Sequence, residues 1–504
     1  MNFFFQKDSL FIFLFLWAVG SVYAQTGFSS FLEIVSTISS STTREALVSD
    51  YMNTVISTGT PVIENDTVHF LYWDNDLSNG SYTFTGDVSN VKLIGDFTDW
   101  GYRNITMRNL AGTSLYYHSM VFEPSARLEY AYIINDLHWI PDPLNSQQIS
   151  NSESINSVLT MPEYEEPWEV DYLSGIPHGT TNGLNVRSDL INREYSVTVY
   201  LPYGYCKNKP NGYPSIYFHD GGTYISDAKA VNIIDNLIAN NFIHPLIAVF
   251  VQPASRNEEY AFMDKYNFGN FFANELVPVI DEKYNTSKAA IDRAVAGVSF
   301  GGNISALISY IYPDVFGNCG LQSASMWPGE FEIQRMIQEG DKKDIKYFSV
   351  WGSYEYELTE SNRELKDVLI DRGYDLTWAE YPEAHHWEFF RSTIDEMLIN
   401  FFSAANREAV SYEGKLPELF ELSQNYPNPF NSLTKINFYL PEESNVKIYL
   451  YNTIGEKIST ITDRIYSKGK HIITLDGNNL SSGVYYYSLI TKLNTQTRGM
   501  ILLK

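Results

Sequence analysis

Ser299 stands in the pentapeptide Gly297-Val298-Ser299-Phe300-Gly301, which fits the G-x-S-x-G pattern of a nucleophile elbow. In such an elbow a serine occupies the tip of a tight turn between a buried strand and a helix, and glycines flank it because larger side chains would collide. Residues 290–296 are apolar enough for that strand, and residues 303–312 have a helical pattern. The predicted chemistry is attack by a serine hydroxyl on an acyl carbon. The pentapeptide alone is weak evidence for a nucleophile, so the prediction depends on the other motifs before and after it in the chain.

A serine nucleophile needs a base, an acid that orients the base, and donors for the oxyanion. Elbow enzymes carry these groups in the order Ser, Asp or Glu, His along the chain. Two histidines, His385 and His386, follow the last expected strand at 375–381, and either could be the base. The acid should end the preceding strand. Glu355 is our first choice there and Glu357 the reserve, although either could be a surface charge.

The oxyanion donors are expected to be backbone N–H groups. One is Phe300, directly after the nucleophile, and the other lies in the turn His219-Asp220-Gly221-Gly222, where glycine leaves an N–H free to face the site. We expect Gly221 to be that second donor and His219 to hold the turn. The sequence contains no H-E-x-x-H motif and no Cys/His cluster, so we expect neither a metal nor a cofactor.

The elements that must position these groups alternate between residues 161 and 407. Short apolar strands such as 195–201 and 246–251 are interleaved with amphipathic helices such as 361–372. Buried strands connected by helices predict an α/β domain with a mostly parallel sheet covered on both faces.

These motifs together resemble the esterase family of α/β-hydrolases that includes the feruloyl and acetyl xylan esterases, the enterochelin esterases, S-formylglutathione hydrolase and the mycolyltransferases. The resemblance covers about residues 175–405 and implies an α/β-hydrolase fold with a serine mechanism. In this family the motif that contains the histidine usually reads P-G-G-H-D-W. Here residues 382–387 read Pro-Glu-Ala-His-His-Trp, which puts His385 at the base and His386 where aspartate is common. The family's acid is usually aspartate in a G-x-x-D turn, and the same spacing here ends in Glu355. The stretches that carry the resemblance are 199–205, 219–222, 275–280, 297–302, 352–355, 362–365 and 382–387.

Large aromatic side chains are candidates for binding the substrate. Trp327 and Trp387 are expected to line the acyl pocket. Trp100, Tyr130 and Trp139 belong to a front domain at 61–160, where short strands and turns predict a β-sandwich. This domain resembles the early-set, glycogen-binding type of immunoglobulin-like domain, mainly through residues 95–100, 130–132 and 136–143. Its aromatics could stack on sugar rings, or they could fill the core and the contact with the next domain.

The two ends of the chain carry export signals. Lys7 and the apolar run 10–19, followed by Val22-Tyr23-Ala24, predict a signal peptide at 1–24, and a helical lead-in follows at 25–60. After a linker at 408–420, residues 421–504 form alternating strands and resemble the C-terminal sorting domain of the type IX secretion system. That resemblance rests on residues 425–431, 451–455, 480–485 and 504. It implies an outer-membrane-bearing bacterium, the secretion machinery as a partner, and delivery to the cell surface or medium.

Charge and composition narrow the possible partners. The 504 residues carry a formal net charge of −25, which argues against nucleic acid or an anionic membrane as a partner. With 44% hydrophobic and 19% charged residues, the chain should form packed domains with no membrane-spanning segment in its mature form. Cys206 and Cys319 are the only cysteines, and export would permit but not require a disulfide between them.

The sequence therefore predicts a secreted serine carboxylic-ester hydrolase, with acyl groups on polysaccharides as the expected substrate class. The expected substrate class rests on analogy with proteins of similar fold. Three alternatives stay open: a non-catalytic surface glycan-binding protein, an acyltransferase, and a siderophore esterase on the same scaffold. The acyl group, its length and the oligomeric state are not encoded in any motif.

Overall fold

The computed structural model describes residues 27–74, 84, 86–103, 105–150 and 155–404, and much of 421–502. The predicted signal peptide and the 408–420 linker lie outside the described residues. The chain divides into two compact units, residues 1–407 and 408–504.

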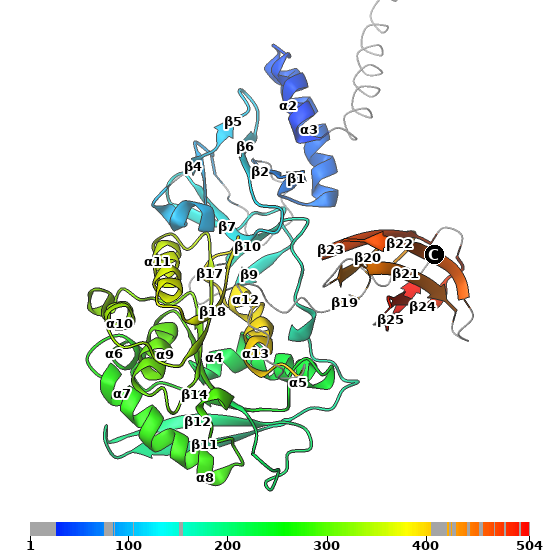
Figure 1. Ribbon diagram of the computed structural model, residues 1–504. Coiled ribbons are helices and arrows are strands. Elements are labelled where there is room, and N and C mark those ends of the chain that lie inside the picture. The colour runs from blue at the N-terminus through cyan, green and yellow to red at the C-terminus, as the bar shows by residue number, and fades with distance from the viewer. Residues whose placement is uncertain are drawn as a thin grey trace, which may run out of the picture. The chain divides into compact units, whose positions relative to one another are not determined.

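The first unit begins with helices α2 (Phe28–Ser36) and α3 (Ser41–Thr58), in the segment where a helical lead-in was expected. Their apolar faces pack on one of two antiparallel sheets that the described residues of 61–160 form (Figure 1). This sheet has the order β1-β2-β6-β5. Its strands are β1 (Val62–Glu64), β2 (Thr67–Trp73), β5 (Arg108–Asn109) and β6 (Leu115–Val121).

The other sheet has the order β4-β3-β7-β10-β9, with β8 paired to β7. One hydrophobic core joins the two sheets, because β2, β3 and β7 all send alternate side chains into it. We call these two sheets the front β region. Its kinship with early-set immunoglobulin-like domains stays a prediction. The strands of the second sheet are β3 (Val91–Gly95), β4 (Ile105–Thr106), β7 (Arg127–Ile134), β8 (His138–Ile140), β9 (Gln148–Ser150) and β10 (Ile155–Thr160), and the turn η1 (Asp96–Gly101) follows β3.

Within residues 155–404, eight further strands form one sheet with the order β11-β12-β14-β13-β15-β16-β17-β18. The pairs β11–β12 and β12–β14 are antiparallel, and the strands from β14 to β18 run parallel. The α/β prediction is therefore correct. The strands are β11 (Thr180–Ser188), β12 (Arg193–Leu201), β13 (Ser215–His219), β14 (Ile247–Val251), β15 (Arg293–Val298), β16 (Asn318–Gln322), β17 (Lys346–Gly352) and β18 (Asp375–Tyr381).

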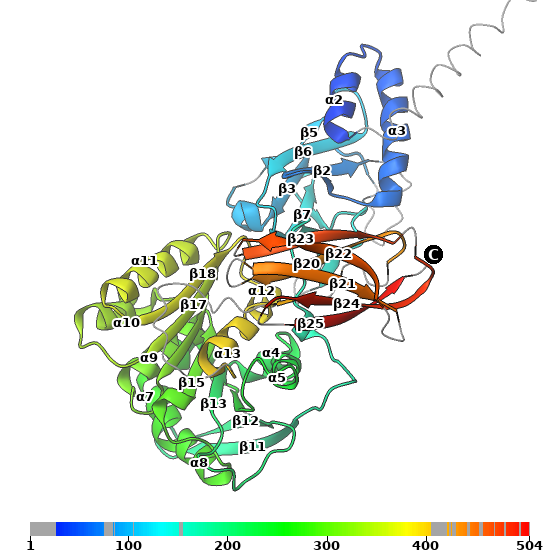
Figure 2. The same cartoon turned by 45° about the vertical axis from the view of Figure 1, so that its right-hand side comes forward.

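Helices cover both faces of this sheet (Figure 2). One apolar core joins one face to α7, α9, α10 and α11, and another joins the opposite face to α5, α12 and α13. The elbow strand differs from its prediction, because residues 290–292 form a 3-10 turn and β15 starts at Arg293. The helices are α4 (Gly221–Ser226), α5 (Ala230–Ala239), α6 (Arg256–Tyr260), α7 (Lys265–Phe271), α8 (Val277–Lys283), α9 (Phe300–Ile311), α10 (Pro328–Glu339), α11 (Glu357–Asp371), α12 (Trp387–Arg391) and α13 (Ile394–Phe402).

The described residues of the second unit form two antiparallel sheets around their own hydrophobic core, β19-β20-β23 and β22-β21-β24-β25. None of the helices in the described parts of the chain is long and apolar enough to cross a membrane. The strands are β19 (Glu421–Leu422), β20 (Leu433–Leu440), β21 (Ser444–Tyr451), β22 (Lys457–Tyr466), β23 (Gly469–Asp476), β24 (Gly483–Ile490) and β25 (Thr495–Leu502).

Candidate active site

Ser299 occupies the single-residue turn between the end of β15 and the start of α9. Its backbone has φ 58° and ψ −121°, a conformation that non-glycine residues rarely adopt and that functional sites often hold. The turn is possible because strand and helix approach closely: a Cβ added to Gly297 would lie 2.4 Å from the carbonyl carbon of Gly301. The elbow predicted from the sequence is therefore present.

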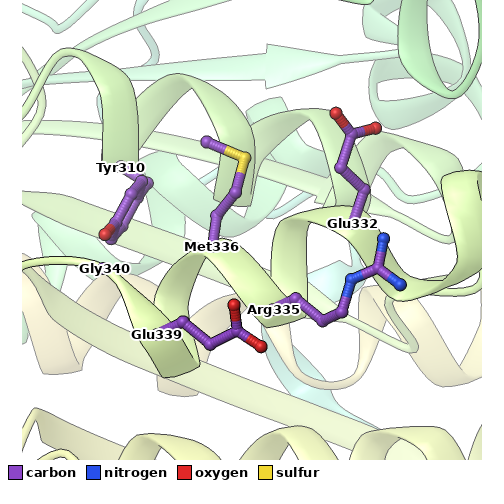
Figure 3. A pocket seen from close by; sticks show the side chains of 6 residues that line it. All are labelled: Tyr310, Glu332, Arg335, Met336, Glu339 and Gly340. Carbon is purple, nitrogen blue, oxygen red and sulfur yellow. The ribbon is translucent and has the colours of Figure 1, made fainter.

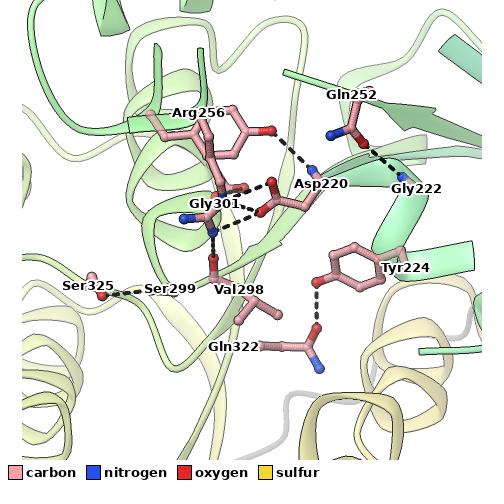
Figure 4. Close-up of polar contacts among 12 residues, drawn as sticks. Asp220, Gly222, Tyr224, Gln252, Arg256, Val298, Ser299, Gly301, Gln322 and Ser325 are labelled. Carbon is pink, nitrogen blue, oxygen red and sulfur yellow. Dashed lines mark hydrogen bonds and ion pairs between the residues drawn. The ribbon is translucent and has the colours of Figure 1, made fainter. Parts of the chain in front are cut away.

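The hydroxyl of Ser299 has a hydrogen-bond partner that the sequence did not suggest. Its Oγ lies 3.0 Å from Oγ of Ser325, which is buried and whose N–H donates to the Ser299 carbonyl (Figure 4). Ser325 follows β16, the strand next to the elbow strand. The carboxyl ends of adjacent parallel strands meet at one edge of the sheet, and this is the one signal that could have found it.

Glu355 and His385 come from the loops after β17 and β18, and the structure brings them together. Nδ1 of His385 lies 3.5 Å from Oε1 of Glu355. The glutamate side chain is fully buried and its Oε1 accepts a 2.6 Å hydrogen bond from Ser323 Oγ, whereas the histidine is 37% exposed. Glu357, the reserve acid, is an exposed residue at the start of α11. Of the two candidate acids, Glu355 is thus the one that lies beside His385, and its contact with Ser323 was not predicted from the sequence.

The serine and the histidine are not hydrogen-bonded to each other among the described residues. Ser299 Oγ is bonded to Ser325 in place of His385. A proton relay from Ser299 to His385 would require the hydroxyl to rotate away from Ser325.

The proposed oxyanion donors begin two helices. Phe300 is the first residue of α9, so its N–H is one of the groups that a helix leaves without an internal partner. Gly221 is the first residue of α4, directly after β13 and Asp220.

Asp220 is fixed in a left-handed conformation with φ 53°. Its carboxylate accepts from Arg256 through Nε at 2.9 Å and Nη2 at 2.8 Å, and its N–H donates to Tyr260 Oη at 3.0 Å (Figure 4). Burial raises the pKa of Asp220, and the guanidinium of Arg256 opposes that rise. This ion pair, not visible in the sequence, holds the turn that presents Gly221.

His219 and His386 are unsuited to act as the base. Burial lowers the pKa of both imidazoles to about 3. His219 has no hydrogen-bond partner on either ring nitrogen among the described residues and packs against Tyr260, which agrees with a structural role. His386 turns toward the front β region, with Nε2 at 2.9 Å from Asp96 Oδ2 and Nδ1 at 3.4 Å from Glu129 Oε1.

The two tryptophans expected at the acyl pocket have different surroundings. Trp327 is about half exposed, and its ring lies 5.3 Å from that of Phe300, beside the nucleophile. Trp387 packs edge-on against Tyr224 at 5.3 Å and Phe390 at 5.6 Å. Trp327 is therefore the more exposed of the two, and its ring packs against Phe300, the residue after Ser299.

In the front β region, Tyr130 is fully buried and its hydroxyl donates to Asp142 at 2.7 Å. Stacking of Tyr130 on a sugar is therefore excluded, and this aromatic belongs to the core. Trp100 and Trp139 stack on each other at 5.4 Å, and Trp139 is 41% exposed. Cys206 and Cys319 are free thiols, the first exposed and the second buried.

An open hollow lies away from these groups, between α9 and α10 (Figure 3). Its lining contains no member of the Ser299, Glu355 and His385 set, so we do not assign it to the reaction. It is lined by Tyr310, Glu332, Arg335, Met336, Glu339 and Gly340.

Two stretches of the chain match known family models. Residues 188–401 match the family model described as Putative esterase, and residues 424–503 match the secretion system C-terminal sorting domain. The chain thus contains an esterase-family domain followed by a type IX sorting tail, and the tail marks a protein of the cell surface or the medium.

Curated relatives share the esterase part. An endo-1,4-beta-xylanase/feruloyl esterase of Xylanibacter ruminicola is 29% identical over 243 residues, 46% of this chain and 32% of that protein. Endo-1,4-beta-xylanase Y of Acetivibrio thermocellus is 31% identical over 247 residues, 42% of this chain and 22% of that protein. The chain thus spans about a third or less of the length of these two relatives.

Among solved structures, the enterobactin esterase of Shigella flexneri, crystallised in the presence of enterobactin, superposes with a TM-score of 0.54 at 18% identity. The superposition covers 66% of this chain and 92% of that one. At this identity the likeness shows a shared α/β-hydrolase-like fold, and its coverage extends beyond residues 188–401.

Proposed function

We propose that this protein is an exported serine carboxylic-ester hydrolase. Ser299 is the nucleophile, His385 the base, and Glu355 the acid that orients the base. The observations that carry the proposal are the strained elbow serine after β15 and the buried Glu355 that lies 3.5 Å from His385, in the loops after β17 and β18. The loop after β16 links them, because Ser325 lies 3.0 Å from Ser299 Oγ and Ser323 donates to Glu355.

In this mechanism the Ser299 hydroxyl rotates from Ser325 to His385 as the ester binds. His385 takes the hydroxyl proton while Oγ forms a bond to the carbonyl carbon, and the oxygen charge is held by the N–H groups of Phe300 and Gly221. The C–O bond to the alcohol then breaks, and His385 returns the proton to the leaving alkoxide. Water repeats the sequence on the acyl-enzyme and releases the acid. Glu355 accepts from Nδ1 and keeps the ring oriented.

The proposed substrates are acyl groups, feruloyl, acetyl or similar, esterified to polysaccharide fragments. Two features support this class. A relative of the esterase part bears the name endo-1,4-beta-xylanase/feruloyl esterase, and the sorting tail would deliver the protein to the cell surface or medium, where it can reach extracellular polysaccharides. The exposed ring of Trp327 beside Phe300 suits a flat aromatic acyl group.

Ester hydrolysis of a catecholate siderophore is the second candidate. It is favoured by the fold shared with an enterobactin esterase beyond the esterase domain alone. Trp327 would serve either aromatic acid.

The test compares wild type with Ser299→Ala on feruloylated, acetylated and plain aliphatic esters and on a cyclic catecholate ester, with Ser57→Ala as the control. Ser57 is an exposed serine on α3. We expect Ser299→Ala to lower kcat by at least about 10³-fold and Ser57→Ala to leave it unchanged. Equal turnover by Ser299→Ala would refute the serine mechanism, and inactivity of the wild type on the whole panel would favour a non-catalytic glycan-binding protein. Acylated acceptor in excess over free acid would indicate an acyltransferase.

A further inference from the structure

Glu355 and His385 are each bracketed by two neighbours that contact the front β region. Tyr354 and Tyr356 flank Glu355, and Ala384 and His386 flank His385. Three of these neighbours touch residues that precede position 130 in the chain, and Ala384 belongs to the core of the front β region, although the family match begins only at residue 188.

On the acid side, the Tyr354 hydroxyl donates a 2.7 Å hydrogen bond to Glu123 Oε2, and its ring lies 6.3 Å from Phe122. Tyr356 has the strained backbone φ 43°, and the guanidinium of Arg103 lies 4.9 Å from the centre of its ring. Both residues that frame Glu355 are therefore tied to the front β region by polar contacts.

On the base side, Ala384 is buried in the hydrophobic core of the front β region itself. His386 lies next to Asp96 and Glu129, which are both buried. Asp96 is in turn held by the Glu129 N–H at 2.6 Å and by Trp100 Nε1 at 2.8 Å. The carboxylate of Asp96 is thus fixed by hydrogen bonds, whereas Nε2 of His386 lies close to it without a hydrogen-bond partner among the described residues.

The two loops also touch each other. The Tyr354 N–H donates to the Glu383 carbonyl at 3.1 Å, and a Cβ on Gly352 would come within 2.2 Å of that carbonyl oxygen. A shift of either loop would therefore move the other.

Other contacts fix the acid–base pair only in part: Ser323 donates to Oε1 of Glu355 at 2.6 Å, and the ring of His385 lies 5.0 Å from that of Phe390. The Glu355–His385 distance is 3.5 Å, Oε2 of Glu355 has no hydrogen-bond partner among the described residues, and His385 is 37% exposed. Catalytic groups need positioning to within a fraction of an ångström, so the flanking contacts decide whether the pair is aligned.

We propose that the front β region acts in the reaction as a positioning element, which aligns Glu355 and His385 through Tyr354, Tyr356, Ala384 and His386. The inference rests on the proposed function and assigns Glu123, Asp96 and Glu129 as positioning residues of the esterase site. Its consequence is that changes in the front β region lower turnover even for a substrate that never touches that region.

The first test is a double-mutant cycle in the full chain, with 4-nitrophenyl acetate as a substrate too small to depend on a glycan site. Tyr354→Phe, Glu123→Ala and the double variant are compared with Glu163→Gln, a change at an exposed glutamate that follows β10. We expect each single variant to lower kcat by roughly threefold to tenfold with KM nearly unchanged, and the double variant to lose no more than the singles. Glu163→Gln should match wild type, and thermal melting should show all variants folded.

The second test uses His386. In His386→Gln the amide can donate toward Asp96, whereas His386→Asp adds a carboxylate to a place already surrounded by those of Asp96, Glu129 and Glu388. We expect kcat to fall by less than about threefold in the first and by at least about tenfold in the second.

Wild-type kcat in Tyr354→Phe and Glu123→Ala, losses that multiply in the double variant, or equal effects of the two His386 substitutions would overturn the proposal. An increase in KM with unchanged kcat would also overturn it, because it would indicate a role in substrate binding. A failure of the proposed function is distinguishable, since it would appear as undiminished turnover by Ser299→Ala.

Discussion

Glu355 and Glu357 lie two residues apart, yet their surroundings differ completely. The Glu355 side chain is fully buried, 3.5 Å from His385 and hydrogen-bonded by Ser323, whereas Glu357 is exposed at the start of a helix. A buried carboxylate that fixes one imidazole nitrogen selects the tautomer in which the other nitrogen can take a proton.

We therefore expect Glu355→Gln to lower kcat by about 10²–10⁴-fold, because the amide can present its N–H to the imidazole and favour the wrong tautomer. Glu357→Gln is the matched control and should stay within about twofold of wild type. Steady-state kinetics on 4-nitrophenyl acetate measures both. The reverse order of the two effects would assign the acid to Glu357.

At this scale the sequence was informative where motifs exist. The elbow pattern, the order of the three groups and the family's histidine motif led to Ser299, Glu355 and His385. The contacts of Ser323 and Ser325 were not predicted, because a serine that follows a strand does not form a recognisable sequence motif. The ion pair between Asp220 and Arg256 was not predicted either, because its partners are 36 positions apart and no periodic pattern connects them.

The elements that carry the site are a strand and a helix in unusually close contact. β15 and α9 meet where glycines at 297 and 301 leave no side chain between them, and the adjacent strand β16 supplies Ser325. The backbone conformation of Ser299 is therefore set by the packing of β15 against α9, and its side chain can rotate about that fixed point.

Gly297→Ala tests this packing. Its new methyl group would lie 2.4 Å from backbone carbon, so strand and helix must separate. We expect a loss of about 1–3 kcal/mol in the free energy of unfolding and a fall in kcat of at least about tenfold. Gly183→Ala on β11 is the control, since nothing lies within 4 Å of the added atom. Urea unfolding and kinetics that left Gly297→Ala like Gly183→Ala would contradict the account.

Element boundaries were less predictable than element types. The alternation of apolar strands and amphipathic helices correctly predicted the parallel sheet with two covered faces. The first residues assigned to the elbow strand instead form a 3-10 turn, because apolar composition alone does not distinguish a strand from the turn that leads into it.

The molecule as a whole combines an esterase-family domain, a front β region within the same compact unit, and a sorting tail with its own core. Sequence motifs identified the esterase and the tail. The contact between the front β region and the catalytic loops was not predictable, because Glu123 and Tyr354 are 231 residues apart and no sequence pattern connects them.

Glu383 lies in the loop that contacts the front β region, and its ionisation should make the folding stability depend on pH. Burial raises its pKa to about 8, Glu166 and Glu388 add to the rise, and Arg127 and Arg391 oppose it. The folded state then holds a proton that the unfolded state has released, so stability from this group is complete below about pH 4.5 and is lost as the pH rises toward about 8.

Glu383→Gln should abolish that dependence. Between about pH 5 and about pH 8 we expect the free energy of unfolding of the wild type to fall relative to the variant, by at most about 1.4 kcal/mol per pH unit. Urea unfolding at several pH values measures the difference, with Glu163→Gln as the exposed control. A difference that stayed constant or grew in favour of the wild type with rising pH would exclude a buried, protonated Glu383.

The central claim is that turnover passes through an ester on Ser299. Rapid acid quench of the wild type during hydrolysis of a slow feruloyl or acetyl ester, followed by mass spectrometry of the peptide that contains residues 297–302, tests it directly. The account predicts that the mass of this peptide rises by one acyl group, and that neither this adduct nor turnover survives in Ser299→Ala. Sustained turnover without an adduct, or an adduct on another residue, would contradict it.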